Sequence, residues 1–342
     1  MSVVSGILFE HIIRFDWSTA VEHAIWAEGL VKRFGETTAL NGVDLAVRTG
    51  SVFGLLGPNG AGKTTAVRIL ATLLRMDEGK ATVGGYDVAT QAHQVRQLIG
   101  LTGQYASVDE TLTGMENLLL IGRLLGMPRR EAKARAKQLL ADFRLSEAAG
   151  RAAKTYSGGM RRRLDLAASL VGRPRILYLD EPTTGLDPRA RLELWDLLRE
   201  LVAGGVTILL TTQYLDEADA LADEIAVIDH GRVIANGTPD ELKAKTGAQT
   251  LAVRPALDSD LPVVQRVVAE LTGAQPDVQG SLVTAQVTEP SVLPAAVRRF
   301  DDAGVVLAEL QLRSSSLDEV FLALTGRPAE EAQAAESEEV PA

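Results

Sequence analysis

Three short segments of this chain carry residue types suited to phosphate chemistry. The first is the run Gly57-Pro58-Asn59-Gly60-Ala61-Gly62-Lys63-Thr64-Thr65, which matches a glycine loop that holds nucleotide phosphates. Its glycines let consecutive backbone N–H groups turn inward around the β- and γ-phosphates, an approach that larger side chains would block. Lys63 is expected to neutralise phosphate charge, and the Thr64 hydroxyl is expected to bind Mg²⁺. This segment therefore predicts a site for MgATP.

Two adjacent carboxylates form the second segment. Asp180 and Glu181 come directly after the apolar run Ile176 to Leu179, and the carboxyl ends of parallel strands are where such sheets bind ligands. Asp180 is the expected Mg²⁺ ligand, directly or through a bound water. Glu181 is the expected general base, because a carboxylate there can polarise a water for attack on the γ-phosphorus. Alone, the pair would be an ordinary acidic strand end, and the glycine loop favours the catalytic interpretation.

The third segment is Ser157-Gly158-Gly159, at the start of a predicted helix. Ser157 can cap that helix, and the two glycines expose N–H groups at its positive end. Apolar residues at helical spacing follow, namely Met160, Leu164, Ala167 and Val171. Taken alone, Ser-Gly-Gly is more often a loop, and Arg161 to Arg163 are more often a solvated helix face than a nucleic-acid patch. With the glycine loop, the segment predicts a second anion-binding device.

These residues need a sheet and helices to position them. The pattern predicts antiparallel strands within 28–47, then a strand at 51–56 that leads through the glycine loop into a helix at 63–74. A helical subdomain is expected around 128–143. The near-continuous apolar runs 176–179 and 206–210, separated by a helix at 189–202, are typical of buried parallel strands in a doubly wound core. A hairpin at 225–235 and a short helix at 242–246 are expected to close this α/β domain.

The remainder predicts a small α+β domain with a ferredoxin-like alternation. Strands are expected at 250–254, 282–287 and 305–312, and helices at 262–271, 292–302 and 317–324. We therefore divide the chain into an N-terminal extension (1–25), an ATPase domain (26–247), a C-terminal accessory or assembly domain (248–326) and a disordered acidic tail (327–342). The tail is rich in Pro, Ala, Glu, Gln and Ser and lacks the aromatic residues that a core needs.

Composition excludes several classes of protein. The 342 residues contain no cysteine, which excludes disulfides, thiolate zinc sites, iron–sulfur clusters and a cysteine nucleophile. A formal charge of −10 has the wrong sign for a chain that binds nucleic acid. No apolar run reaches the ~18 residues that a spanning helix needs. The N-terminus lacks the basic start and cleavage site of a secretory signal, so a cytosolic location is expected.

In this order, the three segments resemble the motifs of ATP-binding cassette (ABC) proteins. The resemblance covers 28–247 and includes Gln104 in Thr102-Gly103-Gln104 and Asp187 in Thr184-Gly185-Leu186-Asp187-Pro188. It implies a P-loop ABC ATPase core with antiparallel β and helical subdomains. It further implies that Phe34 stacks on adenine, that Gln104 joins Thr64 and Asp180 around Mg²⁺, and that Asp187 belongs to a loop at a dimer interface.

The resemblance also implies partners. Two copies would form a head-to-tail dimer, in which Ser157, Gly158 and Gly159 of one subunit close on the ATP held by the other. The segment Tyr105 to Thr113 would contact an integral-membrane permease subunit and link nucleotide closure to transport; its simpler interpretation is a surface loop. The chain would then lie on the cytoplasmic face of the cell membrane as a peripheral subunit.

One departure from the family pattern is informative. Where the family usually has a histidine at the γ-phosphate, this chain has Gln213, which can hydrogen-bond but cannot carry a proton at neutral pH. Glu181 is therefore expected to be the base, and Gln213 a γ-phosphate sensor. Gln213, Thr155 to Asp165 and Ser316 to Gly326 together are similar to the daunorubicin-resistance branch of exporter ATPases. In that branch the late segment implies subunit assembly, although a plain amphipathic helix also fits it.

The function expected is that of the ATP-binding and hydrolysing subunit of an ABC exporter, converting ATP to ADP and phosphate to drive efflux of an amphiphilic drug, antibiotic or lipid. One alternative is a soluble cassette ATPase acting on ribosomes or DNA. The single cassette, the lack of a coiled-coil insertion or cysteines and the negative charge argue against it. The other is a small-molecule kinase or GTPase, which would leave Ser157-Gly158-Gly159 and Gln104 unexplained.

Overall fold

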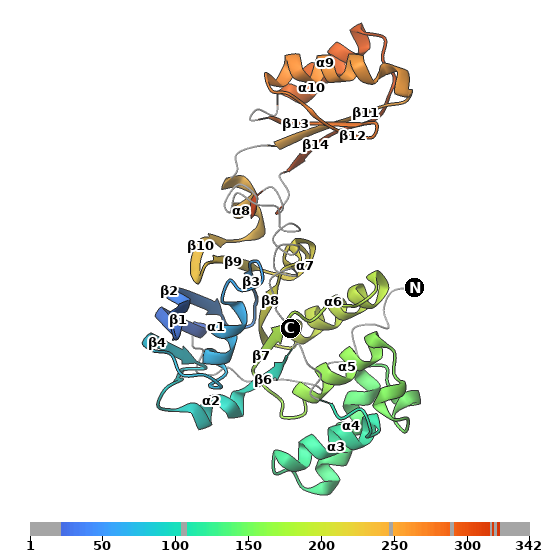
Figure 1. The fold of residues 1–342 in the computed structure, drawn as a ribbon. Coiled ribbons are helices and arrows are strands. Elements are labelled where there is room, and N and C mark those ends of the chain that lie inside the picture. Colours follow the sequence, from blue (N-terminus) through green and yellow to red (C-terminus); the bar gives the residue numbers. More distant parts are fainter. Residues whose placement is uncertain are drawn as a thin grey trace. The chain divides into compact units, whose positions relative to one another are not determined.

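The computed structural model describes residues 22–103, 108–245, 249–287 and 291–314, together with Leu317, Val320 and Phe321. The described residues form two compact units, one reaching Thr238 and the other beginning at Pro239 (Figure 1). The short helix expected at 242–246 is α8 (Pro239–Lys245), which is grouped with the second unit. The N-terminal extension up to residue 21 and the acidic tail lie outside the described residues.

The first unit begins with a four-stranded antiparallel sheet. Its order is β2-β1-β4-β5, formed by β1 (His23–Phe34), β2 (Thr37–Arg48), β4 (Glu78–Val83) and β5 (Tyr86–Asp87). Gly35 adopts a φ of 59° in the tight turn between β1 and β2, a conformation that glycine reaches without steric cost. The antiparallel strands expected at 28–47 are confirmed.

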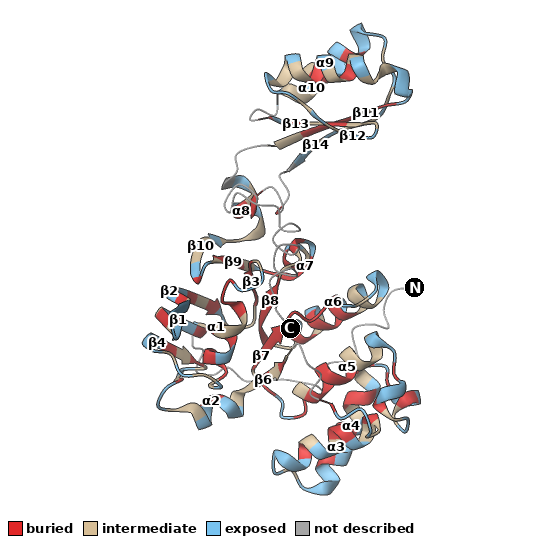
Figure 2. Cartoon of the chain, in the orientation of Figure 1, coloured by how far each residue is buried: buried red, intermediate tan, exposed pale blue. Residues whose placement is uncertain are grey.

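A six-stranded sheet forms the centre of this unit. Its order is β10-β9-β3-β8-β7-β6, from β3 (Val52–Leu56), β6 (Ile99–Thr102), β7 (Ile176–Asp180), β8 (Thr207–Thr212), β9 (Glu224–Asp229) and β10 (Arg232–Gly237). Neighbours from β9 to β6 pair in parallel, and β9 and β10 form an antiparallel hairpin. Every residue of β3, β7 and β8 is buried (Figure 2), as the apolar runs predict.

Helices cover both faces of the central sheet. Both faces of the sheet are apolar, because successive side chains of a strand point to opposite faces. In β7, Leu177 and Leu179 belong to one apolar cluster, and Ile176 and Tyr178 belong to a second cluster. The helices of this unit are α1 (Lys63–Leu70), α2 (Ala92–Leu98), α3 (Gly114–Leu124), α4 (Arg129–Asp142), α5 (Gly158–Ser169), α6 (Pro188–Ala203) and α7 (Leu215–Leu221), with 3₁₀ turns at Ser146–Ala148 and Ala153–Thr155. Of these, α3 and α4 pack against each other and against α5, where a helical subdomain was expected (Figure 1). The helix expected to reach residue 74 ends at Leu70, because Thr72 adopts a left-handed φ of 62°.

The second unit is a βαββαβ fold. It contains β11 (Gln249–Pro255), a 3₁₀ turn (Asp258–Asp260), α9 (Leu261–Thr272), β12 (Asp277–Gln279), β13 (Leu282–Val287), α10 (Val292–Asp302) and β14 (Leu307–Ser314). The sheet order β12-β13-β11-β14, antiparallel throughout, is ferredoxin-like, as expected. The short strand β12 was not expected. None of the described helices combines the length and apolarity that crossing a bilayer requires.

Candidate functional site

The glycine loop connects the end of β3 to the start of α1, as predicted. At Gly57, a Cβ atom would lie 2.2 Å from the carbonyl oxygen of Ile228, so no larger residue fits there. Gly62 is the N-cap of α1 with a φ of 109°, and a Cβ there would lie 2.5 Å from the carbonyl oxygen of Ala39. Glycine is therefore needed both for the turn and for the close approach of neighbouring backbone.

The loop surrounds a cleft of about 300 Å³. Its lining consists of Ala39, Pro58, Asn59, Gly60, Gly62, Lys63, Thr64, Thr65 and Glu181. Lys63 is only 5% exposed, and its ammonium donates hydrogen bonds to the carbonyls of Gly57 (2.6 Å) and Pro58 (2.9 Å). Ala61, within the loop, is buried. The structure thus brings the predicted phosphate loop and the predicted base to one cleft.

Asp180 connects this loop to the central sheet. Its carboxylate accepts hydrogen bonds from the hydroxyl of Thr64, at 3.0 Å, and from the hydroxyl of Thr211 on β8. Asp180 is 5% exposed at the end of β7. A hydroxyl and a carboxylate side by side are hard oxygen ligands of the kind Mg²⁺ takes while it keeps several waters, so the residues fit that ion. Gln104, the third expected ligand, lies outside the described residues.

Glu181 adopts an unusual backbone conformation. Its φ of 49° lies in the left-handed region, which costs a non-glycine residue free energy and persists only where surrounding contacts enforce it. Its N–H donates a hydrogen bond of 3.0 Å to the carbonyl of Thr211. The side chain is 8% exposed, lines the cleft and accepts a 3.4 Å hydrogen bond from the Thr184 hydroxyl. These contacts hold the residue at the edge of the cleft.

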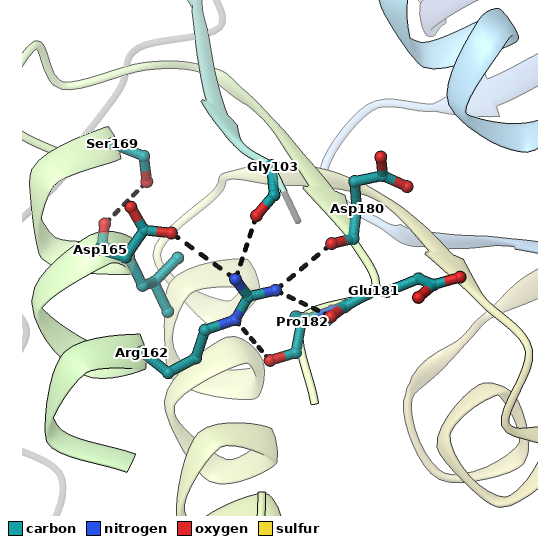
Figure 3. Close-up of polar contacts among 8 residues, drawn as sticks. Gly103, Arg162, Asp165, Ser169, Asp180, Glu181 and Pro182 are labelled. Atoms are coloured by element: carbon teal, nitrogen blue, oxygen red, sulfur yellow. Dashed lines mark hydrogen bonds and ion pairs between the residues drawn. The ribbon is translucent and has the colours of Figure 1, made fainter. Parts of the chain in front are cut away.

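Arg162 differs from the solvated helix face expected for Arg161 to Arg163. Its side chain is 15% exposed and points from α5 toward the end of β7 (Figure 3). It donates to the carbonyls of Pro182 (2.6 Å), Glu181 (2.8 Å), Asp180 (3.3 Å) and Gly103 (3.2 Å). Burial lowers the pKa of Arg162, and nearby acidic groups partly offset this lowering. Sequence reasoning missed this role, because three consecutive arginines give no signal of which one turns inward.

Two further polar residues lie after β8. Gln213 is partly buried, and its side-chain oxygen has no hydrogen-bond partner among the described residues. Glu217, on α7, is completely buried, and this burial raises the pKa of its carboxyl group, with Thr212, Thr183 and Trp195 opposing the shift. Glu217 was not singled out from the sequence, because an acidic residue on a short helix is ordinarily exposed.

The remaining predicted residues do not line the cleft. Ser157 caps α5 by accepting a hydrogen bond from the N–H of Met160 at 3.3 Å, and nothing lies within 4 Å of a Cβ built at Gly158. Gly159 is tighter, since a Cβ there would lie 3.1 Å from that of Ala190. Asp187 caps α6 through the N–H of Ala190. Phe34, 51% exposed, lies at the end of β1 under the ammonium of Lys32, 5.5 Å from its ring centre.

Known sequences resemble the chain over most of its length. A model of the ABC transporter family matches residues 40–184. The chain is 54% identical to the daunorubicin resistance ATP-binding protein DrrA2 of Streptomyces coeruleorubidus, over 92% of this chain and 99% of that protein. It is 50% identical to the daunorubicin/doxorubicin resistance ATP-binding protein DrrA of Streptomyces peucetius, over 94% and 99%. It is also 41% identical to a Nod factor export ATP-binding protein I of Ralstonia nicotianae, over 88% and 93%.

Solved structures match the cassette part of the chain. One is an ABC transporter component of Clostridium perfringens, 26% identical, with a TM-score of 0.61 over 66% of this chain and 92% of that one. Another is a dimeric ATP-binding cassette in a post-hydrolysis state, bound to ADP and phosphate. It is 25% identical, with a TM-score of 0.57 over 63% of this chain and 98% of that one. Both support the α/β ATPase fold.

Proposed function

This chain belongs to the ABC transporter family, and we propose that it is the ATP-hydrolysing subunit that powers efflux of an amphiphilic drug, antibiotic or lipid through a separate membrane subunit. One observation carries the proposal. Lys63 and Glu181 line one cleft with the glycine loop, and Thr64 hydrogen-bonds Asp180 beside them. A phosphate cradle, a site for Mg²⁺ and a carboxylate base are the parts that ATP hydrolysis needs.

Each residue has a distinct task in the proposed reaction. The backbone N–H groups of the loop and Lys63 hold the β- and γ-phosphates and stabilise the negative charge that develops during transfer. Thr64, Asp180 and Gln104 would hold Mg²⁺, which would supply further charge neutralisation. Glu181 accepts a proton from the water that attacks the γ-phosphorus, so ADP and inorganic phosphate result. Gln213 has an amide oxygen without a hydrogen-bond partner among the described residues, and its amide N–H would donate to the γ-phosphate.

The dimer is part of the proposal. Ser157, Gly158 and Gly159 lie at the N-terminus of α5 and are absent from the lining of the chain's own cleft. No described residue lies within 4 Å of a Cβ built at Gly158, so this surface can meet an anion held by another subunit. A head-to-tail pair would place this segment on the partner's ATP, with Asp187 at the interface and Phe34 against the adenine. That one of the similar cassette structures is dimeric supports the pairing of two copies.

A membrane subunit is the proposed partner, with the chain on the cytoplasmic face. Residues 108–113, the described part of the proposed contact segment, are held to α3 by Asn117. Asn117 is 3% exposed, and it exchanges hydrogen bonds of 2.7 and 2.9 Å with the backbone of Asp109. A loop fixed in this way can transmit force to whatever it contacts. The names of the relatives support a drug as cargo.

The experiment that tests the proposal is affinity purification of the tagged full-length chain from gently solubilised membranes of its native cell. Mass spectrometry would identify the co-purifying proteins, and ATP hydrolysis would be assayed on the same sample. We expect a multi-span membrane protein together with MgATP-dependent hydrolysis. Recovery with ribosomes or DNA-repair proteins, and no membrane subunit, would overturn the transport function while leaving the ATPase assignment intact.

A further inference from the structure

Arg162 connects three segments that are distant in sequence. It belongs to α5, and its guanidinium donates hydrogen bonds to Asp180 at the end of β7, to Glu181 and Pro182 just after it, and to Gly103 after β6. All four acceptors are backbone carbonyls (Figure 3). These hydrogen bonds therefore do not depend on which side chains the four acceptor residues carry. What the guanidinium fixes is the path of the backbone at the edge of the nucleotide cleft.

The backbone of Glu181 is held on both sides. Thr211 of β8 accepts a hydrogen bond from its N–H at 3.0 Å, and Arg162 donates one to its carbonyl at 2.8 Å. A left-handed φ of 49° is maintained only by such contacts, because an unrestrained glutamate returns to the right-handed or extended regions. The peptide planes on either side of Glu181 determine where its carboxylate points. Arg162 therefore influences the orientation of the Glu181 carboxylate through the backbone, not through a hydrogen bond to the carboxylate itself.

The guanidinium is itself oriented from α5. Asp165, one turn along the helix and 1% exposed, has a carboxylate oxygen 3.6 Å from an Arg162 nitrogen. The acidic side chains around Arg162 are Asp165 on α5, Asp180 at the end of β7, Glu181 just after it, and Glu217 on α7. They keep the arginine charged within a largely buried setting. The planar fork of donors suits several carbonyls at once, which a lysine ammonium at the end of a flexible stem does not reproduce.

We propose that Arg162 is a positioning residue that makes the aim of Glu181 depend on the position of α5. This inference rests on the proposed function, in which the N-terminus of α5 contacts the ATP of the partner subunit. Closure on the partner's ATP moves α5. Arg162 transmits that movement to Glu181, the proposed general base in the cleft of the same chain, and to Gly103, which precedes Gln104. One chain's hydrolysis is thereby coupled to nucleotide binding at the other site.

The test compares Arg162→Lys with Arg135→Lys in the full-length chain. Arg135 is a matched control, because it is a buried arginine that donates to a backbone carbonyl, that of Leu170 at the end of α5, away from β7. ATP hydrolysis, MgATP affinity and the thermal midpoint are measured for each. For Arg162→Lys we expect kcat to fall about 10- to 100-fold, with a Kd for MgATP within about twofold of wild type and a Hill coefficient reduced toward one.

A double variant separates positioning from folding. If Arg162 acts through Glu181, adding Arg162→Lys to Glu181→Gln should leave the residual single-turnover rate unchanged within about twofold, because two residues that act as a unit are not additive. An undiminished further loss in the double variant would overturn the inference. So would wild-type kcat in Arg162→Lys, or an equal loss in Arg135→Lys. A wild-type chain that does not hydrolyse MgATP would instead overturn the proposed function itself.

Discussion

The hydroxyl of Thr64 donates a hydrogen bond of 3.0 Å to the carboxylate of Asp180, although the two residues are 116 positions apart in the chain. This contact joins the first turn of α1 to the end of β7. It brings together the two oxygen ligands expected for Mg²⁺, and it places both beside the glycine loop. Their proximity follows from the parallel pairing of β3, β8 and β7, whose carboxyl ends meet at one edge of the sheet.

The first prediction concerns the Mg²⁺ requirement. Asp180→Asn preserves the shape of the side chain but replaces one ligand oxygen with an amide nitrogen. We expect the Mg²⁺ concentration for half-maximal hydrolysis to rise about tenfold or more. Titration of the ATPase rate with MgCl₂ at fixed ATP measures this. Thr64→Ser, which keeps the hydroxyl, is the control and should stay near wild type. An unchanged Mg²⁺ requirement in Asp180→Asn would remove Asp180 from the ligand set.

The second prediction concerns the base. Glu181→Gln cannot accept a proton, so the steady-state rate of hydrolysis should fall at least about 100-fold, while ATP still binds. With ATP unhydrolysed, the closed dimer should accumulate and elute earlier in size-exclusion chromatography run with MgATP. The same variant run with MgADP is the control and should elute as wild type does. Normal turnover by Glu181→Gln would contradict the assignment of this residue as base.

The third prediction concerns the sensor residue. Gln213→Ala removes the amide expected to contact the γ-phosphate, so the rate of ATP hydrolysis should fall about tenfold or more while the Kd for ATP stays within about twofold. Isothermal titration and a phosphate-release assay measure the two quantities. Gln279→Ala, on the exposed strand β12, is the matched control. A fully active Gln213→Ala would show that Gln213 has no such role.

The fourth prediction separates the dimer surface from the fold. Among the described residues of the single chain, a methyl group at Gly158 meets nothing within 4 Å, and Gly158 has no left-handed φ. Gly158→Ala should therefore leave the free energy of unfolding within about 0.5 kcal/mol of wild type. Hydrolysis should nevertheless fall about tenfold or more, because the methyl group would occupy the surface that approaches the partner's ATP. Gly150→Ala, at another open glycine, should change neither quantity.

The fifth prediction concerns pH and stability. Burial raises the pKa of Asp142 from 3.8 to about 6, although Arg135 opposes the shift. Between these two values the folded chain holds the proton more tightly, so this group's contribution to stability declines as pH rises from about 4 to about 6. Asp142→Asn should remove that decline and raise the free energy of unfolding at pH 7 by up to about 1 kcal/mol, since the group is only half-buried.

Urea denaturation of both proteins at pH 4.5, 6 and 7.5 tests this fifth prediction. The difference in unfolding free energy between Asp142→Asn and wild type should grow as pH rises. Asp277→Asn, at an exposed position of the second unit, is the control and should follow the wild-type curve. Parallel curves for Asp142→Asn and wild type would mean that Asp142 titrates alike in the folded and unfolded chain.

The features that were predictable from the sequence are local ones. The glycine loop, the capped start of α5 and the buried runs of β3, β7 and β8 each depend on neighbouring residues, because glycine conformations, caps and side-chain periodicity are set within a few positions. The family resemblance depends on the same contiguous motifs. The ferredoxin-like class of the second unit was also predicted from its alternation of strands and helices, although the strand β12 was not.

Contacts between residues that are distant in the chain could not be predicted in this way. Nothing in Arg161-Arg162-Arg163 distinguishes the middle residue. Among the described contacts, however, Arg162 is the one of the three that donates to the carbonyls of Asp180, Glu181 and Pro182. The left-handed φ of Glu181 and the burial of Glu217 were likewise not predictable from the sequence. Each depends on contacts across the sheet or between helices. Such contacts exist only once the hydrophobic clusters have packed, so no local pattern encodes them.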